Sequence, residues 1–378
     1  MTLLVVARFV VGERIVTGRR QGKNERRQAT KQQQQTRRSN GILIFRITTL
    51  LGEETTGTGI HLFSTMGEHC DILSASEVME RGLLYVGFSE ARQQRMTHKQ
   101  LVDEFRGHYG SPPIDISLQW YDMQITTIES ARIDPEDRND KGFKMFMAAN
   151  FFLWVHPKNA KLLSSRFGIS VRKIQSNKYF WKWIYKMGAL VGDKVKWDER
   201  FGDANYAIFC MSIDGVDFNI WEKPSERYNV DSSLCSFKSN HGAWRYLIAL
   251  SVWESKCVYI YGPVKAGAVN DLALWRLDLK QRMSELVNKL AICDRGFQTS
   301  EPDEVHLLAP PSTADPEDLA LFKTRARQRH ETFNGRLKDF KILQDVFRFD
   351  ADKHGSVVRA VVVRVQYQME SGSPLFEV

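Results

Sequence analysis

The stretch Ala207–Gly215, AIFCMSIDG, decides the fold, because an apolar, strand-forming run ends there on an acid and a glycine. Two similar runs follow, RYLIALSVW at 245–253 and CVYIYG at 257–262. The short run LAIC at 290–293 comes after a helix expected over about 271–286. The order predicts an α/β domain with a mixed sheet.

A last helix is predicted to follow this sheet. Asp315, Pro316 and Glu317 form a helix start in which Asp315 is the N-cap, and the helix runs to about Phe340. Its apolar face is expected to pack on the sheet. The residues of that face are Phe322, Ala326, Phe333, Leu337 and Phe340.

Three acidic residues occupy places in this order where they can act together. Asp214 is expected at the end of the first strand, Asp294 at the end of the strand after the first helix, and Glu331 inside the last helix. Carboxylate oxygens of this kind hold Mg²⁺ or Mn²⁺. Two such ions about 3.5–4 Å apart activate a water or a 3′-hydroxyl for phosphodiester displacement. The sequence therefore predicts a metal-dependent site that acts on phosphodiesters.

The last helix places Glu331 beside cations. Arg327, Asn334 and Lys338 share its polar face. We expect Arg327 and Lys338 to bind phosphate next to the metal-binding acid. The alternative is a solvated Glu331 that pairs with Arg327 one turn earlier.

Asp271 is a fourth acid near the expected site. It directly precedes the apolar face of a helix, so we predict that it caps that helix and contacts the metal ligands rather than the metal. Asp294 follows the apolar strand and has no capping role that the sequence reveals. Asp294 is therefore the predicted catalytic acid of the two.

Residues 157–190 are strongly basic, with eight Lys and Arg and no Asp or Glu. A helix over 160–167, a turn at Gly168 and a helix from near Ser170 give helix-turn-helix spacing. The run is interleaved with Tyr179, Trp181 and Trp183, which suits a phosphate-facing surface. The predicted DNA contacts are Arg172, Lys173, Lys178 and Lys182. The alternative is a basic helical pair that packs on the catalytic domain.

The net charge of +8 is concentrated at one end of the chain. Residues 1–50 hold eleven Lys and Arg against two Glu, a net of +9, so the remaining residues sum to −1. Residues 1–65 are expected to be a basic, low-complexity, disordered tail. The tail is either a nuclear-localisation or DNA-tethering arm, or a solvated tail or translated upstream sequence with the true start near Met66.

Composition also excludes several classes of protein. No apolar run approaches the roughly 18 residues of a membrane span, so no membrane partner is expected. The opening segment lacks a cleavage-site pattern, so it is not interpreted as secretory. Five scattered cysteines without a C-x-x-C pair suit a reducing compartment and argue against structural zinc.

Four motifs occur in one order along the chain: D-G at 214–215, G-x-x-x-D at 267–271, D-x-G-F at 294–297 and E-x-F-N-G-x-L-K at 331–338. With the strand pattern, residues 205–345 resemble the Harbinger type of DDE transposases and transposase-derived nucleases. The resemblance implies an RNase H-like catalytic domain in which Asp214, Asp294 and Glu331 bind Mg²⁺ or Mn²⁺. It also implies cleavage and joining of DNA at transposon ends, a nuclear location and often a separate Myb-like helper protein. A homo-oligomer is left open.

The chain departs from the family pattern at four positions. Val216 and Asp217 stand where the family usually has Thr and His, and Cys293 and Phe297 replace the usual Gly and Tyr. Two alternatives therefore stay open. One is a catalytically inactive, transposase-derived DNA-binding protein, and the other is an unrelated RNase H-like nuclease that acts on RNA or repair substrates.

The expected organisation has four parts. The basic tail is followed by a helical, helix-turn-helix-like DNA-binding region, an RNase H-like nuclease domain, and a C-terminal helix with its tail. Their boundaries are 1–65, 66–200, 205–350 and 351–378.

Overall fold

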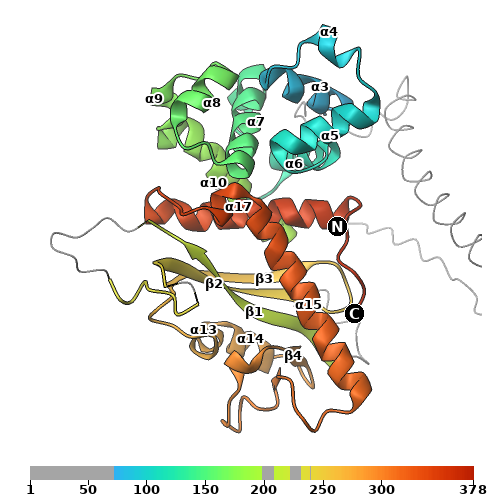
Figure 1. Cartoon of the computed structure of the whole chain (residues 1–378), viewed down its shortest axis with the longest axis vertical. Helices are drawn as coiled ribbons and strands as arrows, with labels where there is room; N and C mark the ends of the chain where they lie inside the picture. Colours follow the sequence, from blue (N-terminus) through green and yellow to red (C-terminus); the bar gives the residue numbers. More distant parts are fainter. Residues whose placement is uncertain (1–71, 198–207, 222–230, 239) are drawn as a thin grey trace, which may run out of the picture. The chain divides into compact units, whose positions relative to one another are not determined.

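The computed structural model describes residues 72–197, 208–221, 231–238 and 240–378 (Figure 1). All of these belong to one compact unit, Cys70–Val378. The predicted basic tail, 1–65, lies outside the described residues. Among the helices that the structure describes, none combines the length and the hydropathy that a membrane span requires.

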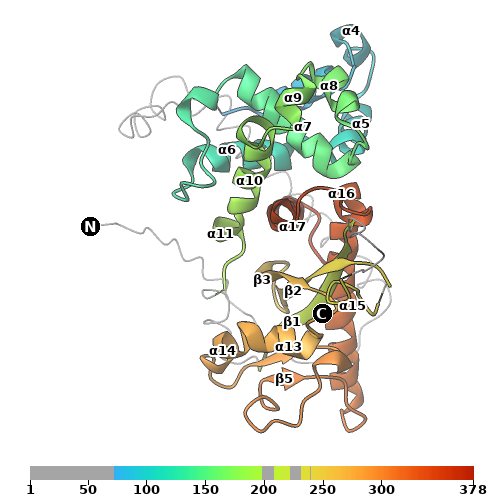
Figure 2. The same cartoon turned by 90° about the vertical axis from the view of Figure 1, so that its left-hand side faces the viewer.

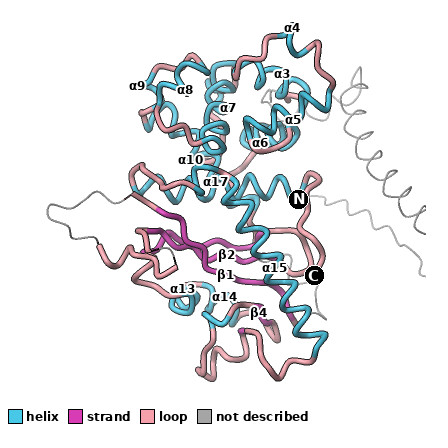
Figure 3. The backbone as a smooth tube through the Cα atoms, viewed as in Figure 1, coloured by secondary structure: helices cyan, strands magenta, loops and turns pink. Residues whose placement is uncertain are grey.

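Residues 72–197 form helices and connecting loops, which Figure 3 separates from the strands by colour. A capping box starts one of these helices at Thr97, whose side chain accepts from Gln100 N while Gln100 Oε1 accepts from Thr97 N. Gly110 then ends this helix in a left-handed conformation. The longer helices are α3 (Ala75–Tyr85), α5 (His98–Tyr109), α6 (Pro113–Ile125), α7 (Asp140–Val155), α8 (Ala160–Phe167) and α10 (Lys182–Ala189), and the shorter ones are α4 (Glu90–Gln93), η2 (Pro135–Asp137), α9 (Val171–Ile174), η3 (Asn177–Trp181) and α11 (Val191–Lys194).

The helix-turn-helix prediction is half right. Helix α8 has the predicted bounds, and Gly168 follows it in the left-handed conformation. The second helix, α9, starts where expected but has only four residues before the chain passes through η3 into α10. Phe180 and Trp181 are adjacent and both buried, and the wider π-helical turn of η3 lets both reach the core.

The tryptophans of the basic stretch do not face a phosphate surface, contrary to the sequence prediction. Trp181 and Trp183 are 2% and 1% exposed. The Trp183 ring stacks on Trp120 of α6, with the ring centroids 6.0 Å apart. Tyr179 alone of the three aromatic residues is exposed. Apolar burial, rather than charge, therefore orients this segment.

Five strands form a mixed sheet in the order β3-β2-β1-β4-β5, which confirms the α/β class. The first three strands are antiparallel neighbours, whereas β4 is parallel to β1 and β5 is parallel to β4. The short strand β5 was not anticipated. The strands are β1 (Phe209–Asn219), β2 (Ala243–Ser251), β3 (Cys257–Lys265), β4 (Leu290–Ile292) and β5 (Leu308–Ala309).

Helices cover both faces of the sheet, as Figure 2 shows. Met211 and Ile213 of β1 belong to a core with α13 (Asp271–Leu277) and α14 (Leu279–Ser284). Val216 and Phe218 belong to the other core, which includes α15 (Glu317–Asp339). Odd and even positions of β1 therefore face different helices, because side chains alternate along a strand.

Two helix predictions in this part need correction. The expected helix over 271–286 is broken at Asp278, whose carboxylate accepts hydrogen bonds from Tyr259 and Arg282. Asp315 is not the N-cap of α15. The cap position is Pro316, and Asp315 instead accepts from the Lys323 ammonium at 2.9 Å.

The C-terminal helix α17 (Ala351–Glu370) links the helical part to the sheet (Figure 1). It contacts α10, α6 and β3, and nearly all of its length is buried. Its Arg364 is fully buried and donates to Gln119 of α6 at 3.3 Å. The short helix α16 (Lys341–Gln344) connects α15 to this segment.

We predict that Trp183→Ala lowers the free energy of unfolding by about 3–5 kcal/mol, because a fully buried indole is removed from the helical core. Tyr179→Ala, at an exposed ring in the same segment, should change it by less than about 0.5 kcal/mol. Urea denaturation of both variants measures the difference. Equal, small losses would show that Trp183 belongs to the surface. If Trp183→Ala does not fold, Trp183→Phe takes its place and should still be less stable than Tyr179→Ala.

Candidate active site

Asp214 and Asp294 are brought together by the parallel pairing of β1 with β4. Ser212 is in register with Ile292, and each acid follows its paired residue by two positions. Asp294 is still extended, with φ −84° and ψ −176°. The two acids therefore leave equivalent points of neighbouring strands. β1 does not end at Asp214 as predicted but continues to Asn219 in its pairing with β2.

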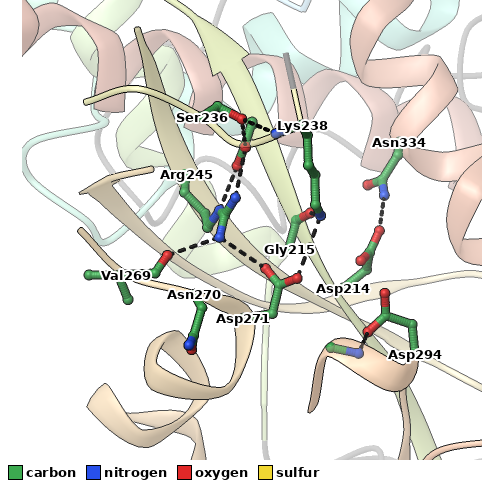
Figure 4. A network of polar contacts seen from close by, with 12 residues as sticks. Asp214, Gly215, Ser236, Lys238, Arg245, Val269, Asn270, Asp271, Asp294 and Asn334 are labelled. Atoms are coloured by element: carbon green, nitrogen blue, oxygen red, sulfur yellow. Dashed lines mark hydrogen bonds and ion pairs between the residues drawn. The ribbon is translucent and has the colours of Figure 1, made fainter. Parts of the chain in front are cut away.

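Helix α15 crosses the same face of the sheet and supplies the third acid. Ile292 and Ala326 share a small core there. Two turns further along α15, Asn334 is 5% exposed and its amide Nδ2 donates to Asp214 Oδ2 at 2.8 Å (Figure 4). Glu331 lies one turn before Asn334 and is exposed. Glu331 and Asp294 both lie near enough to Asp214 to raise the pKa of its carboxyl.

Arg329 attaches α15 to the end of β2, where Ser251 pairs with Met211 of β1, three residues before Asp214. Its buried guanidinium donates to the backbone carbonyls of Ser251, Val252 and Glu254, at the end of β2. One side chain thus supplies hydrogen-bond donors to three backbone carbonyl groups at the end of the strand and just after it. The position of Glu331, two residues later on α15, depends on this attachment.

Asp271 approaches the same acids from the other face of the sheet. A Cβ built on Gly215 would lie 2.2 Å from Asp271 Oδ1, and one built on Gly296 would lie 3.1 Å from Asp271 Oδ2. Gly215 is therefore needed for the close approach of this side chain, and Gly296 gives it further room. We call the four residues Asp214, Asp271, Asp294 and Glu331 the acidic cluster.

The capping roles of Asp271 and Asp294 are the reverse of those predicted. Asn270, not Asp271, caps α13, and its Oδ1 accepts from Ala273 N at 2.7 Å. Asp294 Oδ1 accepts from Gly296 N at 2.7 Å and caps the short helix η4 (Arg295–Phe297). Asp271 is 8% exposed, and helix capping does not account for the burial of its carboxylate.

Two cations on the same face of the sheet account for the burial of the Asp271 carboxylate (Figure 4). Its Oδ1 lies 3.5 Å from Arg245 Nη1, and its Oδ2 lies 3.5 Å from Lys238 Nζ. Arg245 also holds Asp217 through two hydrogen bonds of 2.7 and 2.9 Å. Burial raises the pKa of Asp271, whereas Lys238 and Arg245 lower it. Asp271 is thus paired with cations within the protein, although burial outweighs them and its pKa stays above the ordinary value.

Asp214, Asp294 and Glu331 are not compensated in this way. Within the described residues, none of the three forms an ion pair, including the predicted alternative pair of Glu331 with Arg327. Burial raises the pKa of the Asp214 carboxyl to about 7. Lys238 opposes this shift in the pKa of Asp214, and the other three acids of the cluster add to it. The site concentrates negative charge that the described residues do not balance.

The donor atoms of this site suit a hard divalent cation. Carboxylate oxygens are the preferred ligands of Mg²⁺ and Mn²⁺, and Asn334 Oδ1 is a further buried oxygen without a hydrogen-bond partner. Over the described ranges, no three His, Cys, Asp or Glu side chains are already gathered as a metal site. The residues thus fit such an ion by the chemistry of their donor atoms and by their charge, but not by a ligand arrangement that is already formed.

The predicted phosphate-binding residues fall into different environments. Arg172, Lys173 and Lys178 are exposed on α9 and the turn after it. Lys182 is not a free cation as predicted, because its ammonium pairs with Asp137 and lies 3.9 Å from Asp134. On α15, Arg327 lies near enough to Cys293, the neighbour of Asp294, to lower the pKa of that thiol, although burial raises it overall to about 12. Lys338 is exposed.

Sequence reasoning missed Lys238 and Arg245. Lys238 lies in the loop Asp231–Lys238, which has no recognisable motif, and Arg245 lies in a strand that is otherwise apolar. A signal for Arg245 was available in its place in the strand. The alternation of side chains predicts a buried position there, and charged residues are seldom buried unless they are paired. No signal pointed to Lys238.

Comparison with protein families, with curated proteins and with solved structures finds no match to this chain.

We predict that Asp214→Asn stabilises the protein at neutral and alkaline pH when divalent cations are removed. The pKa of Asp214 rises from 3.8 to about 7 on folding, so wild-type stability is complete below about pH 4 and falls as pH rises through 7. Asn carries no such penalty. Each pKa unit corresponds to about 1.4 kcal/mol, and each kcal/mol to about 2–4 °C in Tm.

Thermal melts with EDTA between pH 4 and pH 8 measure this effect. The Tm of the variant should exceed that of wild type by several degrees at pH 8, and the gap should close at pH 4. Asp339→Asn, at the exposed end of α15, is the control and should follow wild type. Parallel curves for all three proteins would mean that Asp214 is not destabilised by its charge.

Proposed function

We propose that this chain is a metal-dependent DNA endonuclease of the DDE type, with the cleaving and joining activity of a Harbinger-like transposase. Its catalytic domain is proposed to be RNase H-like. In such a sheet the strand after the first helix is expected beside the first strand, and the pairing of β4 with β1 supports this. The order of strands and helices along the chain agrees with it.

The observation that carries the proposal is the register of Asp214 and Asp294. Two acids on neighbouring parallel strands, each two residues beyond the pair Ser212 and Ile292, face a helix that brings Glu331. Mutual repulsion and burial make this arrangement unfavourable without a cation. A protein keeps uncompensated charges together at a cost in stability, and such sites are candidates for function.

Asp214, Asp294 and Glu331 would hold Mg²⁺ or Mn²⁺, and such ions supply the activation of a water or 3′-hydroxyl and the stabilisation of the leaving oxygen. Asn334 holds the Asp214 carboxylate through its amide. Asp271, neutralised by Arg245 and Lys238, supports the cluster from behind. Arg327 and Lys338 extend the site along α15 as phosphate-binding cations.

DNA is the proposed partner, bound at transposon ends in the nucleus. The exposed cations Arg172, Lys173 and Lys178 form a surface that suits the phosphate backbone. A Myb-like helper protein is part of the same proposal. The departure at Asp217 is compensated within the fold by Arg245, so it does not by itself disable the site.

We predict that wild type cleaves DNA only with Mg²⁺ or Mn²⁺ and that Asp214→Asn and Asp294→Asn each reduce the rate about 10²-fold or more. Asn keeps the shape of both side chains and can still cap at position 294, so folding is preserved. Asp271→Asn should reduce the rate less, because this acid is already paired with cations.

A nicking assay on labelled duplexes with Asp339→Asn as control measures these rates. A wild-type protein that binds DNA but never nicks it with either metal would contradict the enzyme and leave a DNA-binding protein derived from a transposase. Cleavage of RNA in preference to DNA would favour the unrelated nuclease. A stronger loss at Asp271 than at Asp294 would reverse their assignment.

We predict that replacing Arg172, Lys173 and Lys178 together with Gln flattens the plot of log K for DNA binding against log salt. The slope should change by roughly one unit for each phosphate that is no longer bound. Lys182→Gln should leave the slope unchanged, because that lysine pairs with Asp137. Fluorescence anisotropy at several salt concentrations measures both. An unchanged slope in the triple variant would mean that this surface does not bind DNA.

A further inference from the structure

Lys238 lies beside the acidic cluster (Figure 4). It belongs to no strand, helix or motif that the sequence predicted. Its Nζ donates to the Gly215 carbonyl oxygen at 3.2 Å and lies 3.5 Å from Asp271 Oδ2. Gly215 directly follows Asp214, so the ammonium lies next to the chain at Asp214 as well as beside Asp271. Its side chain is nevertheless 52% exposed.

The loop holds Lys238 in place through its own backbone and through Ser236. Ser236 Oγ donates to Asp217 Oδ2 at 2.6 Å and accepts from Lys238 N at 3.2 Å. Ala243 N, at the start of β2, donates to Leu234 O at 2.9 Å, and Gly267 N donates to Ser233 O at 2.9 Å. The loop is therefore attached to β1, to β2 and to the segment before α13.

An ammonium group has three N–H donors and no acceptor. Two donors of Lys238 point toward the Gly215 carbonyl and the Asp271 carboxylate. Because the side chain is half-exposed, the third donor remains available to solvent or to a ligand. A cation in this position offers a charge-assisted hydrogen bond to a phosphate oxygen.

The charge balance agrees with this role. When all are ionised, the four carboxylates of the acidic cluster and Lys238 carry a formal charge of −3, and Arg245 cancels Asp217. Two divalent cations would bring the total to +1, and one phosphodiester would bring it to zero. Without Lys238 the same assembly would keep an unbalanced negative charge once the phosphate is bound.

We propose that Lys238 binds a non-bridging oxygen of the DNA phosphodiester that enters the acidic cluster, and that it positions this phosphate for reaction. The inference rests on the proposed function, because it assumes that DNA occupies the site. A purely structural Lys238 would only neutralise Asp271 and would not touch the substrate.

The test compares full-length wild type with Lys238→Gln, Lys238→Met and Lys238→Arg. Lys265→Gln is the matched control, because Lys265 is similarly exposed, at 46%, and pairs with Asp231 at the other end of the loop. Anisotropy with a labelled DNA duplex in Mg²⁺ gives affinity against salt, and a gel of the same samples records nicking. Thermal melts without DNA report folding.

Lys238→Gln and Lys238→Met should flatten the salt slope by roughly one unit and weaken binding by roughly five- to tenfold. Lys238→Arg should keep both because the charge remains, and Lys265→Gln should match wild type. A wild-type slope in the neutral Lys238 variants, or an equal loss in Lys265→Gln, would overturn the proposal.

The outcomes also separate this inference from the proposed nuclease. If wild type binds DNA with the expected difference in slope but never nicks it, the nuclease fails and the phosphate contact at Lys238 stands. If wild type nicks DNA and the neutral variants keep the wild-type slope, the phosphate contact fails alone. If wild type does not bind DNA, both are wrong.

Discussion

The parallel pairing of β1 with β4 is the constraint on which the candidate site depends. Because Ser212 is in register with Ile292, the residues two positions later, Asp214 and Asp294, occupy equivalent positions just beyond the pairing of β1 with β4. A shift of the register by one residue would turn one carboxylate to the opposite face. The apolar residues around this pair are buried and fix the register, so the core determines the spacing of the acids.

The acidic side chains on the two faces of the sheet differ in whether nearby cations pair with them. On the α13 face, Asp271 and Asp217 are held by Arg245 and Lys238. On the α15 face, Asp214 accepts from the Asn334 amide, and burial raises the pKa of its carboxyl to about 7 although Lys238 opposes the shift. One face is neutral within the protein, and the other retains negative charge that suits a cation from solution.

Burial also decides how the basic stretch of the helical part is arranged. Trp183 and Trp181 pack inside, which breaks the second helix and leaves a short turn that exposes Arg172, Lys173 and Lys178. A salt bridge removes Lys182 from this set. The cations that stay on the surface are those left over after the aromatic residues have been buried.

The sequence by itself determined the main strands and helices and their order, and it singled out the four acids of the candidate site. Alternating apolar runs, capping residues and the position of Gly168 are local signals, so strands, helices and their order could be predicted. The pairing of the strands, the capping exchange between Asp271 and Asp294, and the role of Lys238 could not. Asp271 comes to lie against Gly215 and Gly296, and Lys238 against the Gly215 carbonyl, only after the chain has folded. Side-chain partners separated by tens of residues are set by packing, and packing leaves no periodic pattern in the sequence.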